Sequence, residues 1–138
     1  MSLKFVDHFT REEIRAHPAW LFVFGDNYAR AGFGGQPKEA RGEPNSAGLA
    51  TKRAPSWDES AFLTDEDYDE WKLLNRAAFD RIEAHLAAGG VVIWPVGIGL
   101  GRANLQSRAP KILQEIHDWL WAWVDKYGRL SKPKEEKQ

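Results

Sequence analysis

The chain has 138 residues, 43% of them hydrophobic and 28% charged, a composition that is ordinary for one globular domain. Nineteen Lys and Arg against twenty Asp and Glu give a formal net charge of -1, which argues against a broad surface for DNA, RNA or anionic lipid. Because the chain has no cysteine, a disulfide framework, a thiol nucleophile and a cysteine metal site are all excluded.

The sequence indicates no targeting or membrane-spanning segment. Met1–Lys4 lacks the apolar core of a signal peptide, and no run of eighteen apolar residues occurs. Together with the missing cysteines, this pattern favours a reducing compartment. We therefore expect a cytoplasmic protein with no membrane partner.

The first half of the chain predicts strands separated by a short helix. A strand is expected around Lys4–Phe9 and a helix over Arg11–His17. Trp20–Phe24 is a continuous apolar run that stops at Gly25, which is typical of a fully buried strand. A weaker strand is expected at Ala47–Thr51.

The second half predicts a helix, a strand and another helix. Thr64–Ala88 begins with Thr64 as N-cap and carries an apolar stripe formed by Trp71, Leu74, Ala78, Ile82 and Leu86. Val91–Val96 is the second buried apolar run, and from Ser107 the pattern is helical again, with Pro110 in the first turn. This order predicts an α/β fold, a three-layer α/β/α sandwich with a mixed, largely parallel sheet. Residues 1–128 form one domain, and the polar residues 129–138 are expected to be a disordered tail.

Three alternating glycines, Gly97, Gly99 and Gly101, follow the second buried strand. Glycine lets backbone amides approach an anion closely, and the start of the next helix adds its dipole, so phosphate is the natural ligand. Arg102 occupies the position of the last glycine in the dinucleotide fingerprint, and no Walker A lysine follows. A phosphate-binding loop and a tight structural turn are both compatible with this segment.

A second glycine-rich segment follows the first buried strand. Gly25, Asp26 and Asn27 end the strand, and Gly32–Gln36 comes shortly afterwards. Since open α/β sheets bind ligands beyond the carboxyl ends of their strands, we expect the two glycine loops to meet on one side. Asp26 and Asn27 either bond a base or ribose or form an Asx-type turn.

The weaker strand runs into Thr51, Lys52 and Arg53, which places cations at the expected rim of the site. Lys52 either contacts a phosphate or is a solvated surface cation. The four histidines lack metal-ligand spacing, and the G-x-S-x-G motif of serine hydrolases is missing.

These segments resemble the macrodomain family of ADP-ribose-binding α/β/α sandwiches, especially its branch of terminal ADP-ribose glycohydrolases. Leu21–Asn27 with Gly32–Gln36 is similar to the strand and glycine loop that open that family's site. Gly48–Arg53 is similar to the branch's short strand ending in Thr-Lys, and Pro95–Gly101 to the family's phosphate loop. The resemblance extends over roughly residues 20 to 125.

The resemblance implies binding of ADP-ribose or a related nucleotide diphosphate, free or on an ADP-ribosylated macromolecule, with hydrolysis of an ADP-ribosyl linkage as a further activity. No cofactor or metal is expected. Lys52 and Asp26 are the candidate catalytic residues. The residues expected to bind the ligand are Gly25, Asp26, Asn27, Gly34, Gly35, Gln36, Thr51, Lys52, Gly97, Ile98, Gly99, Leu100, Gly101 and Arg102.

Two departures from that family stand out. Gly101 occupies the position of the aspartate that works with the lysine in the glycohydrolase branch, and only a polar tail follows Tyr127 where macrodomains usually add a strand. Without that aspartate, Lys52 acts as a nucleophilic amine only if burial or neighbouring cations such as Arg53 lower its pKa. Asp26 and Glu43 are the nearby substitutes for a general base.

Two other classes of function remain open. The same phosphate loop suits a hydrolase or transferase for another phosphorylated small molecule. Alternatively, the seven tryptophans serve a non-enzymatic interaction domain, in which Trp121 is a dimer contact rather than a scattered exposed aromatic. The oligomeric state is not determined by the sequence.

Overall fold

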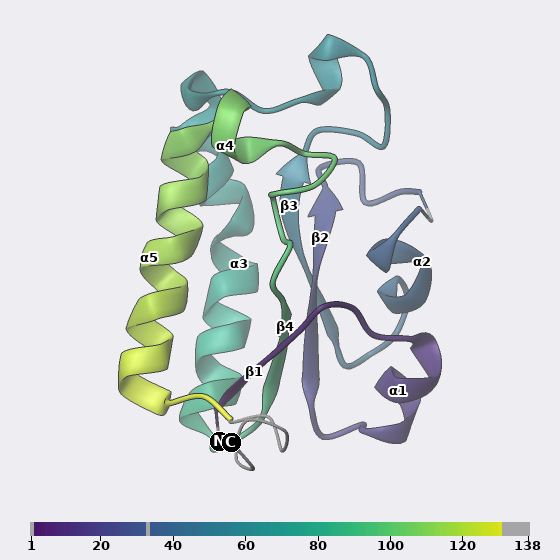
Figure 1. The fold of residues 1–138 in the computed structure, drawn as a ribbon, viewed down its shortest axis with the longest axis vertical. Coiled ribbons are helices and arrows are strands. Elements are labelled where there is room, and N and C mark those ends of the chain that lie inside the picture. Colours follow the sequence, from purple (N-terminus) through teal and green to yellow (C-terminus); the bar gives the residue numbers. More distant parts are fainter. Residues whose placement is uncertain (1, 33, 131–138) are drawn as a thin grey trace, which may run out of the picture.

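The computed structural model describes residues 2–32 and 34–130. It contains a parallel sheet with helices on both faces (Figure 1). Within these residues, four strands form one sheet in the order β1-β4-β2-β3. Their bounds are Leu3–Val6 for β1, Leu21–Asn27 for β2, Ser46–Lys52 for β3 and Val92–Pro95 for β4. The predicted α/β class is confirmed.

The expected mixed character of the sheet is not found among the described strands. Every strand pair is parallel, and antiparallel pairing is limited there to an isolated bridge between Lys52 and Phe62. The reason lies in the connections, because each pair of consecutive strands is joined by a segment that contains a helix and returns the chain to the same end of the sheet.

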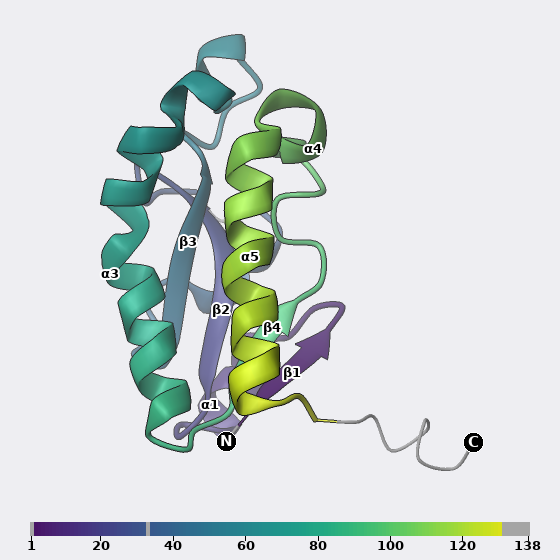
Figure 2. The same ribbon diagram turned by 90° about the vertical axis from the view of Figure 1, so that its left-hand side faces the viewer.

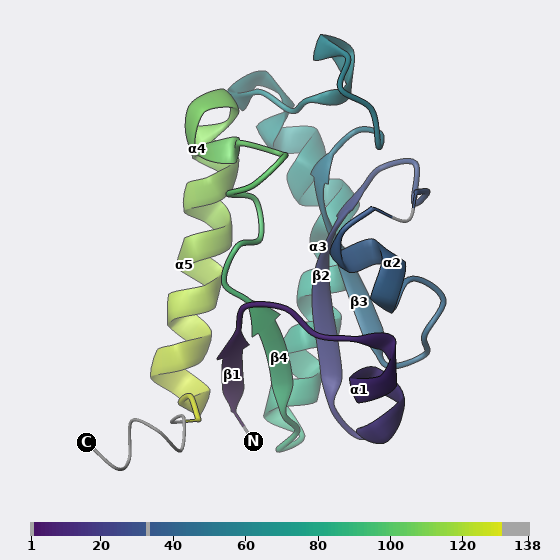
Figure 3. The same ribbon diagram turned by 45° about the vertical axis from the view of Figure 1, so that its right-hand side comes forward.

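Two long helices, α3 (Tyr68–Ala87) and α5 (Pro110–Tyr127), lie side by side on one face of the sheet (Figure 2). The short helices α1 (Arg11–Ala16) and α2 (Gln36–Ala40) lie on the opposite face (Figure 3). The remaining elements are α4 (Leu105–Arg108) and the 3-10 turns η1 (Glu59–Ala61) and η2 (Asp65–Asp67).

Alternate residues of β2 are buried on opposite faces of the sheet. Leu21 and Val23 belong to the larger apolar cluster beneath α3 and α5, whereas Phe22 and Phe24 belong to the smaller cluster beneath α1 and α2. This two-sided burial explains the unbroken apolar run that predicted the strand. The larger cluster also accounts for three of the tryptophans, namely Trp71, Trp94 and Trp123.

The buried face of α3 differs from the predicted stripe, because it includes Asn75 and Phe79 and leaves out Leu74. Leu74 is 51% exposed, and Asn75 is fully buried in its place. Asn75 Oδ1 accepts a hydrogen bond from Ala50 N at 2.8 Å, and Trp71 Nε1 donates to Ala50 O at 2.7 Å. Both backbone groups of Ala50 on the edge strand β3 are therefore satisfied by side chains of α3.

The two ends of the described chain meet at the edge of the sheet. β1 stops at Val6 rather than at Phe9, so Asp7 and His8 leave the sheet at its carboxyl end. Arg129 forms a parallel bridge with Leu3, and Leu130 N donates to Leu3 O at 2.8 Å. The rest of the expected tail, residues 131–138, lies outside the described residues.

Candidate functional site

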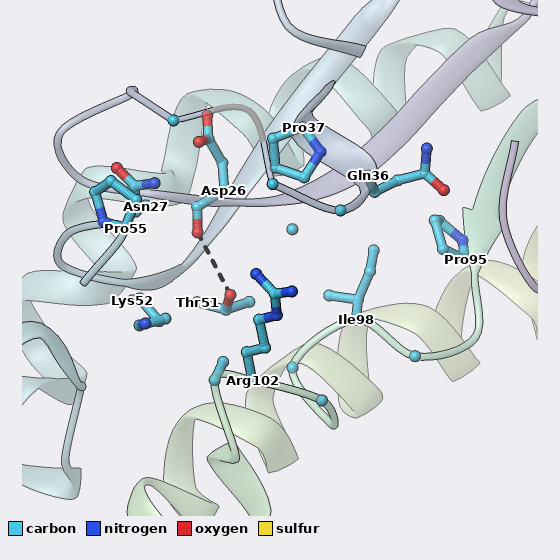
Figure 4. Close-up of a pocket in the computed structure, with 18 of the residues that line it drawn as sticks. Asp26, Asn27, Gln36, Pro37, Thr51, Lys52, Pro55, Pro95, Ile98 and Arg102 are labelled. Carbon is cyan, nitrogen blue, oxygen red and sulfur yellow. Dashed lines mark hydrogen bonds between the residues drawn. The ribbon is translucent and has the colours of Figure 1, made fainter. Parts of the chain in front are cut away.

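The carboxyl ends of the strands open into a cleft of about 620 Å³, walled mainly by the loops that follow β2, β3 and β4 (Figure 4). This is the edge at which open α/β sheets bind ligands. All the expected ligand-binding residues except Leu100 line it, namely Gly25, Asp26, Asn27, Gly34, Gly35, Gln36, Thr51, Lys52, Gly97, Ile98, Gly99, Gly101 and Arg102. The two glycine loops therefore meet in one hollow, as the sequence predicted.

Leu100 is the exception among the residues of the glycine loop after β4. Its side chain is 40% exposed and does not line the cleft. Its backbone N–H closes the turn instead, since it donates to Gly97 O at 3.0 Å.

The loop from Gly97 to Gly101 uses its backbone amides alternately. Ile98 N donates to Pro95 O at 3.2 Å and Leu100 N to Gly97 O, which closes two turns. No acceptor within residues 2–32 and 34–130 is bonded to the amides of Gly97, Gly99 or Gly101. These three N–H groups are therefore available to an acceptor on a ligand.

Only one of these glycines is required by the backbone itself. Gly99 has φ +81°, and an added Cβ would lie 2.7 Å from Leu105 Cδ1. At Gly97 and Gly101, by contrast, an added Cβ would meet nothing within 4 Å. The expected dipole of the following helix contributes little, because α4 spans only Leu105–Arg108.

Arg102 is the central cation of the cleft. Its guanidinium points toward the middle of the hollow in Figure 4, and an added Cβ at Gly34 would lie 3.1 Å from its Nη1. Among the described residues, Arg102 has no hydrogen-bond acceptor or ion-pair partner, and its contact is with the ring of Trp57, whose centroid lies 5.9 Å from Cζ. A guanidinium whose donors are not used by the surrounding protein is suited to bind a carboxylate or phosphate oxygen.

Lys52 lies beside Arg102 in a partly enclosed position. Its Nζ donates to Ser56 O at 2.5 Å and lies 4.4 Å from the centroid of the Phe62 ring. Burial, and then the positive charges of Arg102 and Arg108, lower the pKa of the Lys52 amine. The direction of this change is the one that a nucleophilic amine requires.

Arg53, the cation that the sequence suggested as a neighbour of Lys52, does not lower its pKa. It forms an ion pair with Asp67 of η2 instead. Because α3 follows η2 directly, this ion pair links the end of β3 to the start of α3 rather than to the cleft.

Asp26, the other candidate catalytic residue, is 6% exposed and held by two arginines. Arg41 Nη2 donates to Oδ1 at 2.7 Å, and Arg30 Nη1 donates to Oδ2 at 3.2 Å. Arg41 also donates to the backbone oxygens of Gly32 and Ala31. This arrangement favours a role for Asp26 in shaping the loop after β2 over a role as a general base.

The side-chain amides of Asn27 and Gln36 are also engaged. Asn27 Nδ2 donates to Ala31 O at 2.9 Å and its Oδ1 accepts from Ala31 N at 3.4 Å, so the side chain closes the loop after β2 over four residues rather than forming an Asx turn. Gln36 Nε2 donates to Phe9 O at 2.8 Å, and its Oε1 accepts from Phe9 N at 3.0 Å. Both residues border the cleft, but their polar atoms hold neighbouring segments in place.

Glu43, the second substitute base, is not among the residues that line the cleft. Its carboxylate binds Arg11 and Arg15, and the hydrogen bond from Arg15 is the main cause that lowers the pKa of Glu43. It thereby ties the segment after α2 to α1.

Several residues that line the cleft were missed by sequence reasoning, among them Asp7, His8 and Trp57. Asp7 and His8 were included in the predicted strand, although two consecutive polar residues are a signal that a buried strand has ended. Trp57 stands alone in a polar loop, where no periodicity marks it.

A second hollow of about 380 Å³ lies between α5 and β1, lined mostly by apolar side chains such as Phe5, Trp94 and Leu130. Trp121 lines it and is 52% exposed. The described chain contains no group of three or more His, Asp or Glu that could hold a metal ion. Nor does any helix in that part of the chain combine the length and apolar character needed to cross a bilayer.

Comparison with known proteins gives a family but no described activity. Residues 4–119 match the model of a family of unknown function, DUF7831. Neither the curated proteins nor the solved structures gave a match. Because the matched segment includes most of the chain and every loop of the cleft, the protein belongs to this family of unknown function, DUF7831.

Proposed function

We propose that the cleft binds ADP-ribose or a related nucleotide diphosphate, in a three-layer α/β/α fold of macrodomain type. One observation carries the proposal: Gly97, Gly99 and Gly101, whose amides have no acceptor among the described residues, line the same hollow as Arg102, whose guanidinium likewise has none there. Donors of this kind are the usual partners of phosphate oxygens.

The distribution of charge around the cleft supports an anionic ligand. Arg102 and Lys52 contribute positive charge, and the carboxylate of Asp26 is offset by its pairing with Arg30 and Arg41. Arg102 and Lys52 repel each other, and after burial this repulsion is the next cause of the lowered pKa of Lys52. A diphosphate beside both would relieve this repulsion.

Calorimetric titration with ADP-ribose tests the proposal, with Gly101→Glu and Gly101→Gln as a matched pair. Neither side chain meets a neighbour at Cβ, and Gly101 has no positive φ, so both variants should fold. A carboxylate about 5 Å from a phosphate costs about 1 to 2 kcal/mol at an effective dielectric of about 40 to 80, so Gly101→Glu should weaken binding about tenfold or more. Gly101→Gln should remain close to wild type.

Two results would contradict this proposal. The first is that the wild-type protein gives no heat with millimolar ADP-ribose. The second is that the Glu and Gln variants bind equally well. A thermal-shift panel of nucleotides and sugar phosphates then separates ADP-ribose from other phosphorylated small molecules, since the preferred ligand stabilises the folded state most.

Hydrolysis of an ADP-ribosyl linkage is a second candidate, favoured by the lowered pKa of Lys52. The neutral amine can attack C1′ of an ester-linked ADP-ribose, so that a C–N bond forms as the C–O bond to the departing carboxylate breaks; water then cleaves the C–N bond, which releases ADP-ribose and restores the amine. Release of ADP-ribose from an ADP-ribosylated carboxylate should be slower in Lys52→Ala than in wild type. Equal rates would remove Lys52 from the mechanism.

A further inference from the structure

Trp57 is an exposed aromatic side chain on the wall of the cleft. It lies in the loop between β3 and η1, lines the cleft and is 70% exposed. An indole ring is a large apolar surface, and rings of this kind are enriched at interfaces, where a partner covers them. Its place inside a cleft, rather than on an outer face, suggests a partner small enough to enter that cleft.

The backbone around Trp57 is anchored on both sides. Arg53 N donates to Ala61 O at 2.8 Å, which closes the base of the loop. Asp58 N donates to Ser56 Oγ at 3.0 Å immediately beside Trp57. Two hydrogen bonds from Arg108 to Glu59, at 2.8 and 3.1 Å, tie the same loop to α4. Little ordering of this loop is therefore needed when a ligand arrives.

The two cations of the proposed phosphate site lie over the indole ring of Trp57. Lys52 Nζ is 5.1 Å and Arg102 Cζ 5.9 Å from its centroid. A ligand that places phosphates on these cations and carries a planar aromatic group would therefore bring that group within reach of Trp57. A nucleotide has both parts.

We propose that Trp57 is the stacking platform for the base of the bound nucleotide. The inference rests on the proposed function, and it adds the part of the ligand that the glycine loops do not contact. Base–aromatic stacking is tolerant of base identity because every base has a π-face.

The surroundings of the platform point to weak discrimination among bases. Asp26 and Asn27 are the residues expected to bond a base or ribose, but Asp26 is paired with two arginines and the amide of Asn27 is bonded to Ala31. The cleft should therefore distinguish ligands with a base from ligands without one. Between adenine and guanine it should discriminate little.

Calorimetric titration of ADP, GDP and pyrophosphate tests this, with wild type, Trp57→Ala, Trp57→Phe and the control Trp121→Ala. Trp57→Ala should weaken both nucleotides about tenfold and leave pyrophosphate unchanged. Trp57→Phe keeps a ring and should retain most of the affinity. Trp121 is comparably exposed but lines the second hollow, so Trp121→Ala should change none of the three.

The outcomes separate this inference from the proposed function. Equal weakening of nucleotides and pyrophosphate in Trp57→Ala would mean that Trp57 only shapes the cleft, and no weakening of either would mean that it contacts neither. Both results overturn the stacking role while leaving phosphate binding intact. If wild type binds none of the three probes, the proposed function and the stacking role fail together. Unfolding temperatures check that each variant is folded.

Discussion

Replacing Asn75 with leucine should destabilise the protein by about 1 to 3 kcal/mol, the cost of leaving a buried polar group without its hydrogen bond. Asn75 is fully buried, and its Oδ1 accepts from Ala50 N at 2.8 Å. Leucine has a similar volume, so little cavity forms, but it has no acceptor for the Ala50 amide. The hydrogen bond that is lost belongs to the edge strand β3, which ends at Lys52 in the cleft.

Urea unfolding measures the effect, with Leu74→Ala as the control on the adjacent residue. Leu74 is 51% exposed, so its truncation should change the free energy of unfolding by about 0.5 kcal/mol or less. Both variants should retain the wild-type dependence on urea, which reports the surface exposed on unfolding. The reasoning is refuted if Asn75→Leu is as stable as wild type, or if the Leu74 variant loses as much.

Two titrations give further predictions. Burial, and then the charges of Asp67 and Glu70, raise the pKa of Tyr28 from 10.0 to about 12. The contribution of Tyr28 to the free energy of unfolding is therefore complete below pH 10 and is lost as the pH rises through 12. The loss of stability over that range should disappear in Tyr28→Phe, and identical urea midpoints for both proteins from pH 9 to 12 would contradict it. The pKa of Lys52 is lowered, so burial of its charge reduces the free energy of unfolding at low pH, and this reduction is relieved as the pH rises toward 10.5. Arg102→Gln should raise the pKa of Lys52 in an NMR titration of lysine side chains, and an unchanged value would exclude their coupling.

The elements that depend on continuous apolar runs could be predicted from the sequence. Trp20–Phe24 and Val91–Val96 correspond to the central strands β2 and β4, which are covered on both faces. The buried face of α3 could be predicted only in part. Periodicity favours Leu74, whereas Asn75 is buried because the edge strand β3 needs an acceptor, and that need is invisible before the strand is placed.

The glycine loops of the candidate site could be predicted because their chemistry is local. Convergence of the loops follows from parallel strands, whose carboxyl ends lie at the same edge of the sheet. The ion-pair partners of Asp26 could not be predicted in this way. Arg41 lies fifteen residues further along the chain, and only the fold brings its guanidinium to the carboxylate.

The arginine partners of Asp26 limit the chemistry that this carboxylate can perform in the cleft. Of the acidic residues that line it, Asp26 is neutralised by Arg30 and Arg41, and Asp7 enters from β1, at the edge of the sheet farthest from β3 and Lys52. A carboxylate acts as a general base only where it can accept a proton close to the reacting group. The cleft instead concentrates N–H donors and cations on the side of β3 and the loop after β4. These donors and cations are better suited to hold an anion than to activate water.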